Sequence, residues 1–302
     1  MDAKQPASLL VAVADRAQSW VEAVTMLQRV REDPDATSRD LERAGDRARN
    51  FGQFTTALEF YDRAKERDPD NRSAALEYHC LLAEVRHDGR DMSLHKAREL
   101  VVESANSEYL KRLANTYIAL DRYADLRGLC ETLLDGVEYR AKVDVQVFAH
   151  RNLAVALKEE NDFFGAEEHL REALRQKPDD KGSLTALIGV LEEQERHDGA
   201  LLEATRLVAS DPTQGRFVFM LAEALDLLGR DAEAVEWYER AVDSLPEGSL
   251  RFRAIEEREK CPARHTMRDA LNALAANLVA TPNRVQVTRV LPASADRGGA
   301  PV

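Results

Sequence analysis

Apolar, small and proline residues recur along the chain at a fixed interval of 34 positions between residues 149 and 246. Each interval contains a leucine, an alanine 13 residues later and a proline 12 residues after that. The equivalent positions are Leu153, Leu187 and Leu221, then Ala166, Ala200 and Ala234, then Pro178, Pro212 and Pro246. A repeat of this length is typical of a solenoid, in which each unit packs only against its neighbours.

Each unit is predicted to be a hairpin of two helices. In each unit a second leucine follows the first after four residues, so both lie on the same apolar face of a first helix. Further apolar residues mark the inner face of a second helix. These positions are Leu157, Leu191 and Leu225 on the first helix, and Ala173, Leu207 and Ala241 on the second. The proline ends each second helix because it lacks an N–H and disfavours the helical conformation in the residue before it.

The three units resemble the tetratricopeptide repeat family, whose pattern over 34 residues is Trp-x2-Leu-Gly-x2-Tyr, then Ala-x3-Phe, then Pro. Two family positions depart from this pattern, the first aromatic and the glycine. The replacements are His150, Leu184 and Val218 for the aromatic, and Ala154, Ile188 and Ala222 for the glycine. The resemblance implies an all-α fold, a right-handed superhelical solenoid of helix hairpins.

The same pattern extends over nearly the whole chain and implies about seven hairpins within residues 1–282, the first and the last of them degenerate. The repeat that ends at Pro69 matches the family best. In it we expect Gly52 to close the first helix, because glycine takes a left-handed conformation without a Cβ penalty. An irregular connection is expected near residues 135–146, where several residues are added before the regular units begin.

The pattern changes toward the C-terminus. After Pro246 we expect a charged helix over residues 250–259, an interruption at Pro262 and a second helix over residues 267–278, which together make the degenerate last repeat. Residues 283–302 are predicted to be a flexible or extended tail. Such a tail could also add to the sheet edge of a partner or lead into a further domain.

The amino-acid composition and net charge indicate which kinds of molecule the protein is expected to bind. The 302 residues are 44% hydrophobic and 32% charged, and their formal net charge is -12. Nucleic acids and anionic membranes are bound by clustered Lys and Arg, so neither is expected as a partner, whereas a protein or a peptide is. No apolar run approaches the roughly 20 residues that span a bilayer.

Three cysteines, Cys80, Cys130 and Cys261, lie far apart without paired spacing, which argues against a disulfide framework or a zinc ribbon. This usage indicates a reducing compartment, and a cytoplasmic location is expected. A run at residues 8–14 resembles the apolar core of an export signal, but it is short. The abundance of Ala, Arg and Asp favours a bacterial source.

In the tetratricopeptide repeat family the first helices line a concave groove, so their exposed residues are the expected partner-binding positions. Lys111, Asn115 and Asn152 resemble part of the carboxylate clamp with which some members bind acidic C-terminal peptides of chaperones. The clamp is incomplete, because the next first helix has Gly182 and Ala186 where the clamp has Lys and Arg. A co-chaperone-like function is therefore the less favoured alternative.

Other candidates for partner binding lie on later first helices. Arg151 belongs to the middle of the chain, and a second group combines aromatic, thioether and charged side chains. That group is Arg216, Phe219, Met220 and Glu223. Aromatic residues, Met and Arg are enriched at protein interfaces. In the alternative interpretation Phe219 or Met220 packs between hairpins and Arg216 is solvated.

Catalytic, cofactor-binding and metal-binding residues are not predicted. The sequence has no Gly-rich phosphate loop, no His-Glu-x-x-His and no Gly-x-Ser-x-Gly. His79, His87 and His95 recur every eight residues, but eight residues of helix separate ligands by about 12 Å. We therefore expect a non-catalytic interaction scaffold or adaptor that holds a peptide or helix of another protein in its groove. The alternative is a regulatory or substrate-recruiting subunit of an enzyme complex.

Overall fold

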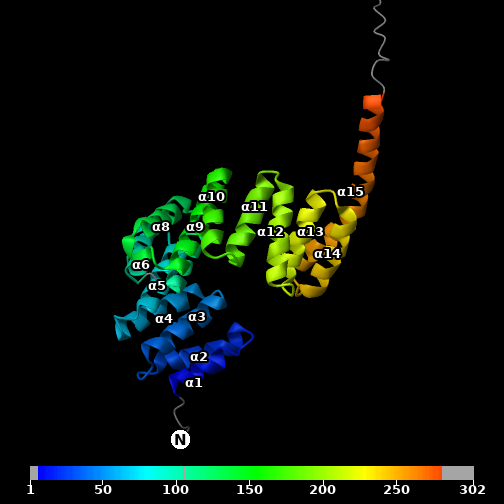
Figure 1. Cartoon of the computed structure of the whole chain (residues 1–302). Coiled ribbons are helices and arrows are strands. Elements are labelled where there is room, and N and C mark those ends of the chain that lie inside the picture. The colour runs from blue at the N-terminus through cyan, green and yellow to red at the C-terminus, as the bar shows by residue number, and fades with distance from the viewer. Residues whose placement is uncertain (1–5, 105, 281–302) are drawn as a thin grey trace, which may run out of the picture. The chain divides into compact units, whose positions relative to one another are not determined.

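The computed structural model describes residues 6–104 and 106–280 (Figure 1). Within these ranges it contains α-helices, one 3-10 helix and no strand, which confirms the predicted all-α fold. The predicted tail, residues 283–302, lies outside the described part of the chain. The helices are α1 Ala7–Ala14, α2 Trp20–Glu32, α3 Ser38–Asn50, α4 Phe54–Arg67, α5 Arg72–Val85, α6 Arg90–Ser104, α7 Ser107–Ala119, α8 Tyr123–Asp135, η1 Val137–Tyr139, α9 Val143–Glu159, α10 Phe163–Gln176, α11 Lys181–Glu193, α12 His197–Ser210, α13 Gly215–Leu227, α14 Asp231–Ser244 and α15 Ser249–Ala280.

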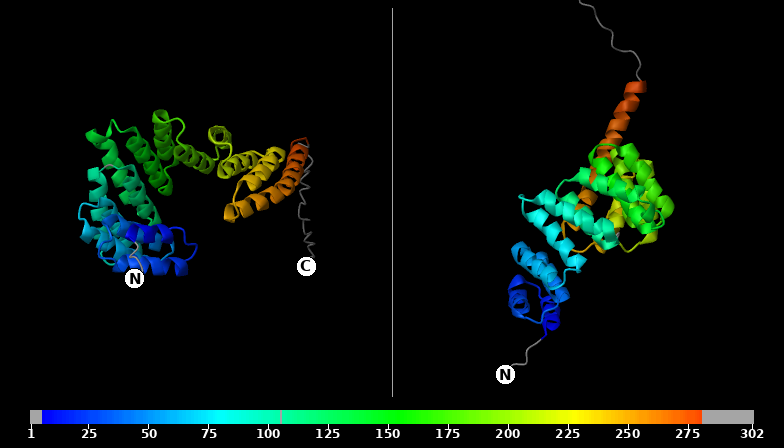
Figure 2. Two further views of the ribbon diagram at one scale, coloured as in Figure 1. Left: turned by 90° about the horizontal axis from the view of Figure 1, so that it is seen from below. Right: turned by 90° about the vertical axis from the view of Figure 1, so that its left-hand side faces the viewer.

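The chain divides into two compact units, of which the first ends at Ser210 and the second begins at Asp211. The first unit consists of six helix hairpins, from α1–α2 to α11–α12. The second unit consists of the hairpin α13–α14 followed by α15. Figure 2 shows this succession of hairpins from two further directions.

Each hairpin of the first unit is held by two kinds of packing. Its two helices pack against each other, and in every hairpin from α1–α2 to α9–α10 the second helix also packs against the first helix of the next hairpin. In addition, the first helices α3, α5, α7, α9 and α11 contact one another in sequence and form a continuous row. Several of the partner-binding residues predicted from the sequence belong to the helices of this row.

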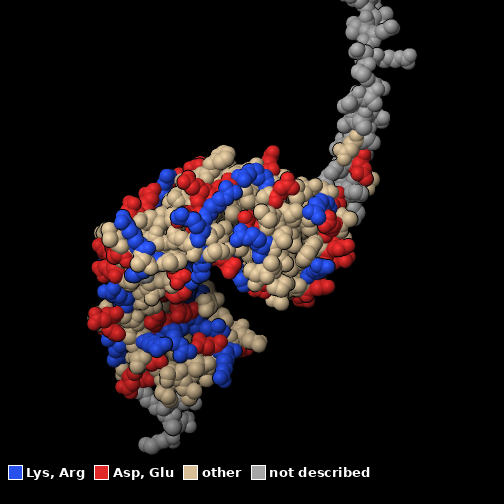
Figure 3. All heavy atoms as spheres, viewed as in Figure 1, with Lys and Arg blue, Asp and Glu red and all other residues tan. Residues whose placement is uncertain are grey.

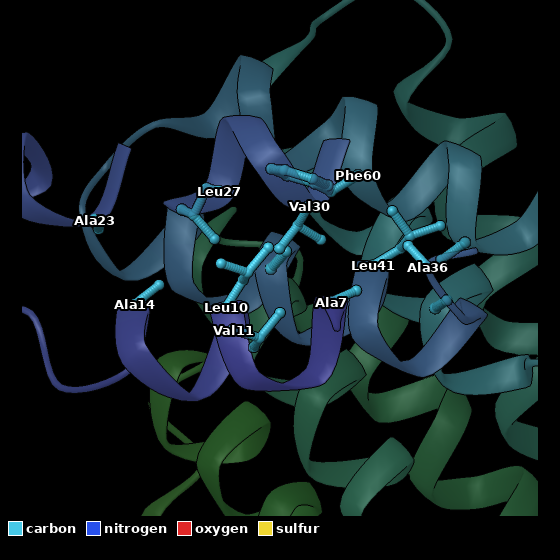
Figure 4. Packing of buried hydrophobic residues seen from close by; sticks show 13 residues of the cluster. Ala7, Leu10, Val11, Ala14, Ala23, Leu27, Val30, Ala36, Leu41 and Phe60 are labelled. Atoms are coloured by element: carbon cyan, nitrogen blue, oxygen red, sulfur yellow. The ribbon is translucent and has the colours of Figure 1, made fainter. Parts of the chain in front are cut away.

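The N-terminal hairpin shares an apolar core with the helices that follow it (Figure 4). Leu10 of α1 and Leu27 and Val30 of α2 are buried and lie in one cluster with Phe60 of α4. Complete burial of one such side chain stabilises the folded state by about 1.5–3 kcal/mol. The degenerate first repeat is therefore a true hairpin that packs on the repeat after it.

In most hairpins, a residue with a left-handed backbone conformation follows the end of the first helix. Gly52 has a φ of 72°, as the sequence predicts, and Gly229 has a φ of 75° at the corresponding place. In three other hairpins the left-handed position is occupied by a residue other than glycine. These residues are Asp121, Asn161 and Glu195, with φ values of 54°, 63° and 56°. Asp and Asn tolerate this conformation better than most residues, whereas Glu does not share that tolerance.

The connection between α8 and α9 differs from the other connections. It contains the short helix η1, and the hydroxyl of Tyr139 in η1 donates a hydrogen bond to the carbonyl oxygen of Val102 at 2.7 Å. Helix α9 then begins at Val143 and has 17 residues, so it extends beyond the length of the other first helices. This extra N-terminal length brings Asp144 and Val147 to the edge of the first-helix row.

The last helix corrects one expectation. The sequence predicts two helices separated at Pro262, but α15 continues through this residue from Ser249 to Ala280. Proline removes one backbone hydrogen bond from a helix, and the bonds before and after it can persist. The predicted last hairpin is therefore a single helix, and it packs against α14 within the second unit.

Candidate functional site

A pocket opens where three first helices of the first unit begin. It has a volume of about 330 Å³ and lies at the N-terminal ends of α7, α9 and α11. We name it the α7–α9 pocket and define it by its lining residues Ser107, Lys111, Asp144, Val147, Phe148, Arg151, Lys177 and Asp180. Its lining is mainly polar, with two apolar residues, both of them buried.

Three cations of this pocket each have a carboxylate partner. Nζ of Lys177 lies 3.0 Å from a carboxylate oxygen of Asp144, and Nη1 of Arg151 lies 3.1 Å from one of Asp180. Lys111 pairs with Glu108 on its own helix at 2.8 Å. A lysine has three N–H donors and an arginine has five, so these contacts leave donors free on every cation. The pocket therefore retains capacity to bind an anionic group.

Asp180 fixes the position of Arg151. It is the N-cap of α11 and accepts hydrogen bonds from the backbone N–H of Ser183 at 2.8 Å and from its hydroxyl at 2.7 Å. Burial by itself would raise the pKa of Asp180, but the hydrogen bonds from Ser183 and the charge of Arg151 lower the pKa below its usual value. Asp180 is thus an ionised partner that orients the guanidinium.

The small residues of α11 make room for cations of α9. A Cβ atom at Gly182 would lie 2.5 Å from Nη1 of Arg151, so a side chain at this position would overlap the guanidinium. Seven residues further along both helices, a Cβ at Gly189 would lie 3.9 Å from Nζ of Lys158. The sequence suggests a small, uncharged face on α11. In the structure that face is covered by long cationic side chains from α9.

The predicted clamp residues Lys111, Asn115 and Asn152 and the separate candidate Arg151 occupy different kinds of position. Lys111 and Arg151 both line the α7–α9 pocket. Asn115 is exposed on α7 and is not part of the pocket lining. Asn152 is buried, and its side-chain amide donates a hydrogen bond to the carbonyl oxygen of Phe148 in its own helix at 2.8 Å. The structure therefore brings two of these four residues together.

Sequence reasoning missed Phe148, Lys177 and Asp180 as members of this pocket. The last two lie in the connection between α10 and α11, just outside the regular helical positions on which the repeat pattern depends. The only signal in the sequence was the irregular connection before α9, which changes how α9 is offset from α7. No pattern within one repeat predicts that offset.

The candidates of the second unit lie on α13. Arg216 is exposed and Met220 is partly buried, whereas only 2% of Phe219 is exposed. The ring of Phe219 packs 5.7 Å from that of Tyr238 on α14, and the guanidinium of Arg253 lies 5.2 Å from its centre. Phe219 thus contributes to the core of its unit.

Glu223, the remaining candidate on α13, forms an ion pair with Arg253 of α15. Of the four candidates on α13, therefore, only Arg216 and parts of Met220 and Glu223 are accessible to solvent.

An ion-pair network that the sequence did not reveal links three first helices. Nε of Arg112 on α7 lies 2.7 Å from Glu77 on α5, and its Nη1 lies 2.7 Å from Glu84 on the same helix. Glu77 also pairs with Arg49 of α3 at 2.9 Å. Arg112 is only 14% exposed, so these contacts are largely shielded from water. The network joins α3, α5 and α7. Figure 3 shows that cationic and anionic side chains are mixed on one face of the chain.

The described residues contain no group of three or more His, Cys, Asp and Glu side chains arranged to hold a metal ion. His79 lies partly buried on α5, and burial together with the charges of Lys65 and Lys96 lowers its pKa to about 4. Burial also raises the pKa of the Cys80 thiol to about 11. Among the described helices, none is long and apolar enough to cross a membrane.

Comparison with known proteins identifies repeat-family sequence in one part of the chain. Residues 151–214 and again residues 190–249 match the family model described as tetratricopeptide repeat. No curated protein matches the chain significantly.

Solved structures share the fold at low sequence identity. PilW, described as a widely conserved type IV pilus biogenesis factor, aligns with a TM-score of 0.55 at 15% identity, over 72% of this chain and 98% of its own. A tetratricopeptide repeat protein from Parabacteroides merdae aligns with a TM-score of 0.52 at 14% identity, over 81% of this chain and 93% of its own. At these identities the likeness concerns the fold alone. The family-model matches identify residues 151–249 as tetratricopeptide repeats, and the other described hairpins share the fold of the solved repeat structures.

Proposed function

We propose that this protein is a protein–protein interaction scaffold whose first unit binds a peptide segment of a partner along the row of first helices. In this proposal an acidic group of the peptide, either a side chain or the C-terminal carboxylate, enters the α7–α9 pocket. The observation that carries the proposal is the convergence of Lys111, Arg151 and Lys177 on one open pocket of about 330 Å³.

The chemistry of the pocket supports a carboxylate as the recognised group. Hydrogen bonds between ionised donors and acceptors contribute more than neutral ones, about 1.5–3 kcal/mol each. The side chain of Lys111 is 52% exposed, so solvent weakens its contribution. Asp180 holds Arg151 in place before a ligand arrives, which reduces the entropy lost on binding, whereas the exposed pair of Lys177 and Asp144 constrains Lys177 less.

The proposal differs from the carboxylate clamp that the sequence suggests. Asn152 donates to its own helix, and the third cation of the pocket comes from Lys177 in the connection after α10. Lys111 is shared by both arrangements. Substitution of Asn115 therefore distinguishes them, because Asn115 belongs to the clamp and not to the pocket lining.

A peptide-array experiment tests the proposal with the full-length protein. The probes are fluorescent decapeptides with acidic residues placed internally or at the end, each made with a free and with an amidated C-terminus. We expect a subset of acidic peptides to bind, and Lys111→Gln to weaken that binding about tenfold, since one charge-assisted contact is lost. Lys260→Gln on α15, which is outside the pocket, is the matched control.

Several outcomes count against the proposal. Equal binding of acidic and neutral peptides would remove the role of the carboxylate. Unchanged affinity in both Lys111→Gln and Lys177→Gln would exclude the pocket. Loss of binding in Asn115→Ala would favour the clamp instead. Copurification of a catalytic chain that binds the same surface would support the alternative function, a regulatory or substrate-recruiting subunit of an enzyme.

A further inference from the structure

Two histidines meet inside the α9–α10 hairpin. Nδ1 of His150 on α9 lies 3.0 Å from Nδ1 of His169 on α10, and the ring centres are 5.3 Å apart with an angle of 30° between the ring planes. Both residues are partly buried. A hydrogen bond between two such nitrogens requires a proton on one and a lone pair on the other. The contact therefore persists when the pair is neutral or carries one extra proton, and it is lost when both rings are protonated.

The charges around His150 come from helix α10. Burial has the largest effect and lowers the pKa of His150, and His169 lowers it further. Glu172 opposes these effects, while Arg175 reinforces them. Glu172 is itself engaged by Arg175 at 2.6 Å and by Gln176 at 3.1 Å. Among the described residues, the helices α7, α8 and α11, which also pack against α9, add no charge of comparable effect on His150.

The histidine pair lies in the hairpin that builds most of the α7–α9 pocket. His150 directly precedes Arg151, and α9 also supplies Asp144, Val147 and Phe148 to the pocket. Helix α10 leads into Lys177, whose ion pair with Asp144 joins the two ends of the hairpin. Any change in the packing of α10 on α9 therefore alters the spacing of the pocket cations.

We propose that the His150–His169 pair makes the α9–α10 hairpin sensitive to acid, and that protonation of both rings loosens this hairpin and disables the α7–α9 pocket. Two positive rings facing each other at hydrogen-bonding distance repel, and neither can accept the other's proton. The effect on ligand binding rests on the proposed peptide-binding function. The effect on the hairpin does not.

The direction of the pH dependence follows from proton linkage. In the packed hairpin the second proton binds less readily than in the opened hairpin, where each ring approaches the ordinary histidine pKa of about 6.5. The opened form consequently binds more protons as the pH falls. The stability of the hairpin is complete above about pH 6.5 and decreases on acidification.

Hydrogen exchange on the full-length protein tests this inference without any ligand. Amide protection of residues 143–176 is measured at pH 7.5 and pH 5.5, corrected for intrinsic exchange, and compared with residues 107–135 as an internal reference. We expect opening of the α9–α10 hairpin to increase about tenfold or more relative to the reference in the wild type. The double variant His150→Gln, His169→Gln is expected to lose this difference, and His95→Gln, which alters an exposed histidine elsewhere, is expected to retain it.

Histidine NMR provides a second measurement that does not depend on the double variant folding. In the wild type, the pKa of His150 should lie below the ordinary histidine value of about 6.5, because burial and the facing ring of His169 both oppose its protonation. In His169→Gln the pKa of His150 should rise, because the facing ring is absent. An unchanged pKa of His150 in His169→Gln, or equal acid opening in the wild type and the double variant, would overturn the inference.

Peptide binding at the two pH values separates this inference from the proposed function. An acidic peptide that binds at pH 7.5 and dissociates at pH 5.5 in the wild type, but not in the double variant, supports both. Binding that is independent of pH in the wild type overturns the acid sensitivity of the pocket. A hairpin that opens in acid while no acidic peptide binds at either pH contradicts the proposed function alone.

Discussion

The guanidinium of Arg151 occupies the space that a side chain at residue 182 would fill, because a Cβ on Gly182 would lie 2.5 Å from Nη1 of Arg151. The absence of a side chain at Gly182 on α11 therefore provides the space that the Arg151 side chain of α9 occupies. A side chain at residue 182 would require the guanidinium of Arg151 to move from its present place beside Asp180 in the α7–α9 pocket.

Substitution of Gly182 tests this relationship. Replacing a glycine by alanine within a helix ordinarily stabilises the folded state by about 0.5–1 kcal/mol. At Gly189 this gain should be realised, since the new Cβ would lie 3.9 Å from Lys158. At Gly182 the displacement of Arg151 should offset the gain. Chemical denaturation of the two variants measures the difference, and equal stabilisation by both would contradict the close packing of Arg151 on Gly182.

The Arg112 network should be important for the stability of the first unit. Arg112→Met removes the cation that pairs with Glu84 and leaves Glu77 with Arg49 alone, and breaking a shielded pair of this kind costs about 3 kcal/mol. Arg127→Met removes an exposed cation that pairs with Glu131 and should cost at most about 1 kcal/mol. Denaturant unfolding of both variants provides the measurement. A similar small effect at the two positions would show that the network contributes little.

The left-handed backbone of Glu195 is a site for stabilisation. Its φ of 56° places it in the region that residues with a Cβ avoid, at a cost of about 1–2 kcal/mol. Glu195→Gly removes that cost but increases the entropy of the unfolded chain, so a net stabilisation of about 0.5–1 kcal/mol is expected. Gly52→Ala introduces the same strain at the equivalent turn and should destabilise the protein. Thermal unfolding of the pair measures both effects, and a decrease in stability with Glu195→Gly would refute the prediction.

His79 should make the protein less stable in acid. Its pKa is lowered to about 4 by burial and by Lys65 and Lys96, so the folded state resists a proton that the unfolded state accepts below about pH 6.5. Stability should therefore fall from about pH 6.5 down to about pH 4 and then level off, with a total loss of at most about 3 kcal/mol. His79→Gln should flatten this part of the stability curve. Urea titrations at several pH values measure it, with His95→Gln as the exposed control.

Much of the fold could be predicted from residue spacing alone. The interval of 34 residues, the apolar stripe through Leu153 and the proline at Pro178 depend only on the geometry of a single hairpin, and the structure contains the hairpins where they were expected. Gly52 takes the predicted left-handed conformation for the same local reason. Pro262 is the exception, because the loss of one backbone hydrogen bond does not by itself end a helix such as α15.

The candidate site depends on relations between helices that no single repeat encodes. The sequence identified Lys111 and Arg151 as surface cations, but only the structure shows that they share a pocket with Lys177. The structure also buries Asn152 and brings His150 against His169. The periodicity of a helix determines which residues share one of its faces. Only the packing of neighbouring helices decides which side chains from different repeats meet, because that packing depends on the offset and rotation of each helix and on the volume of every residue between them.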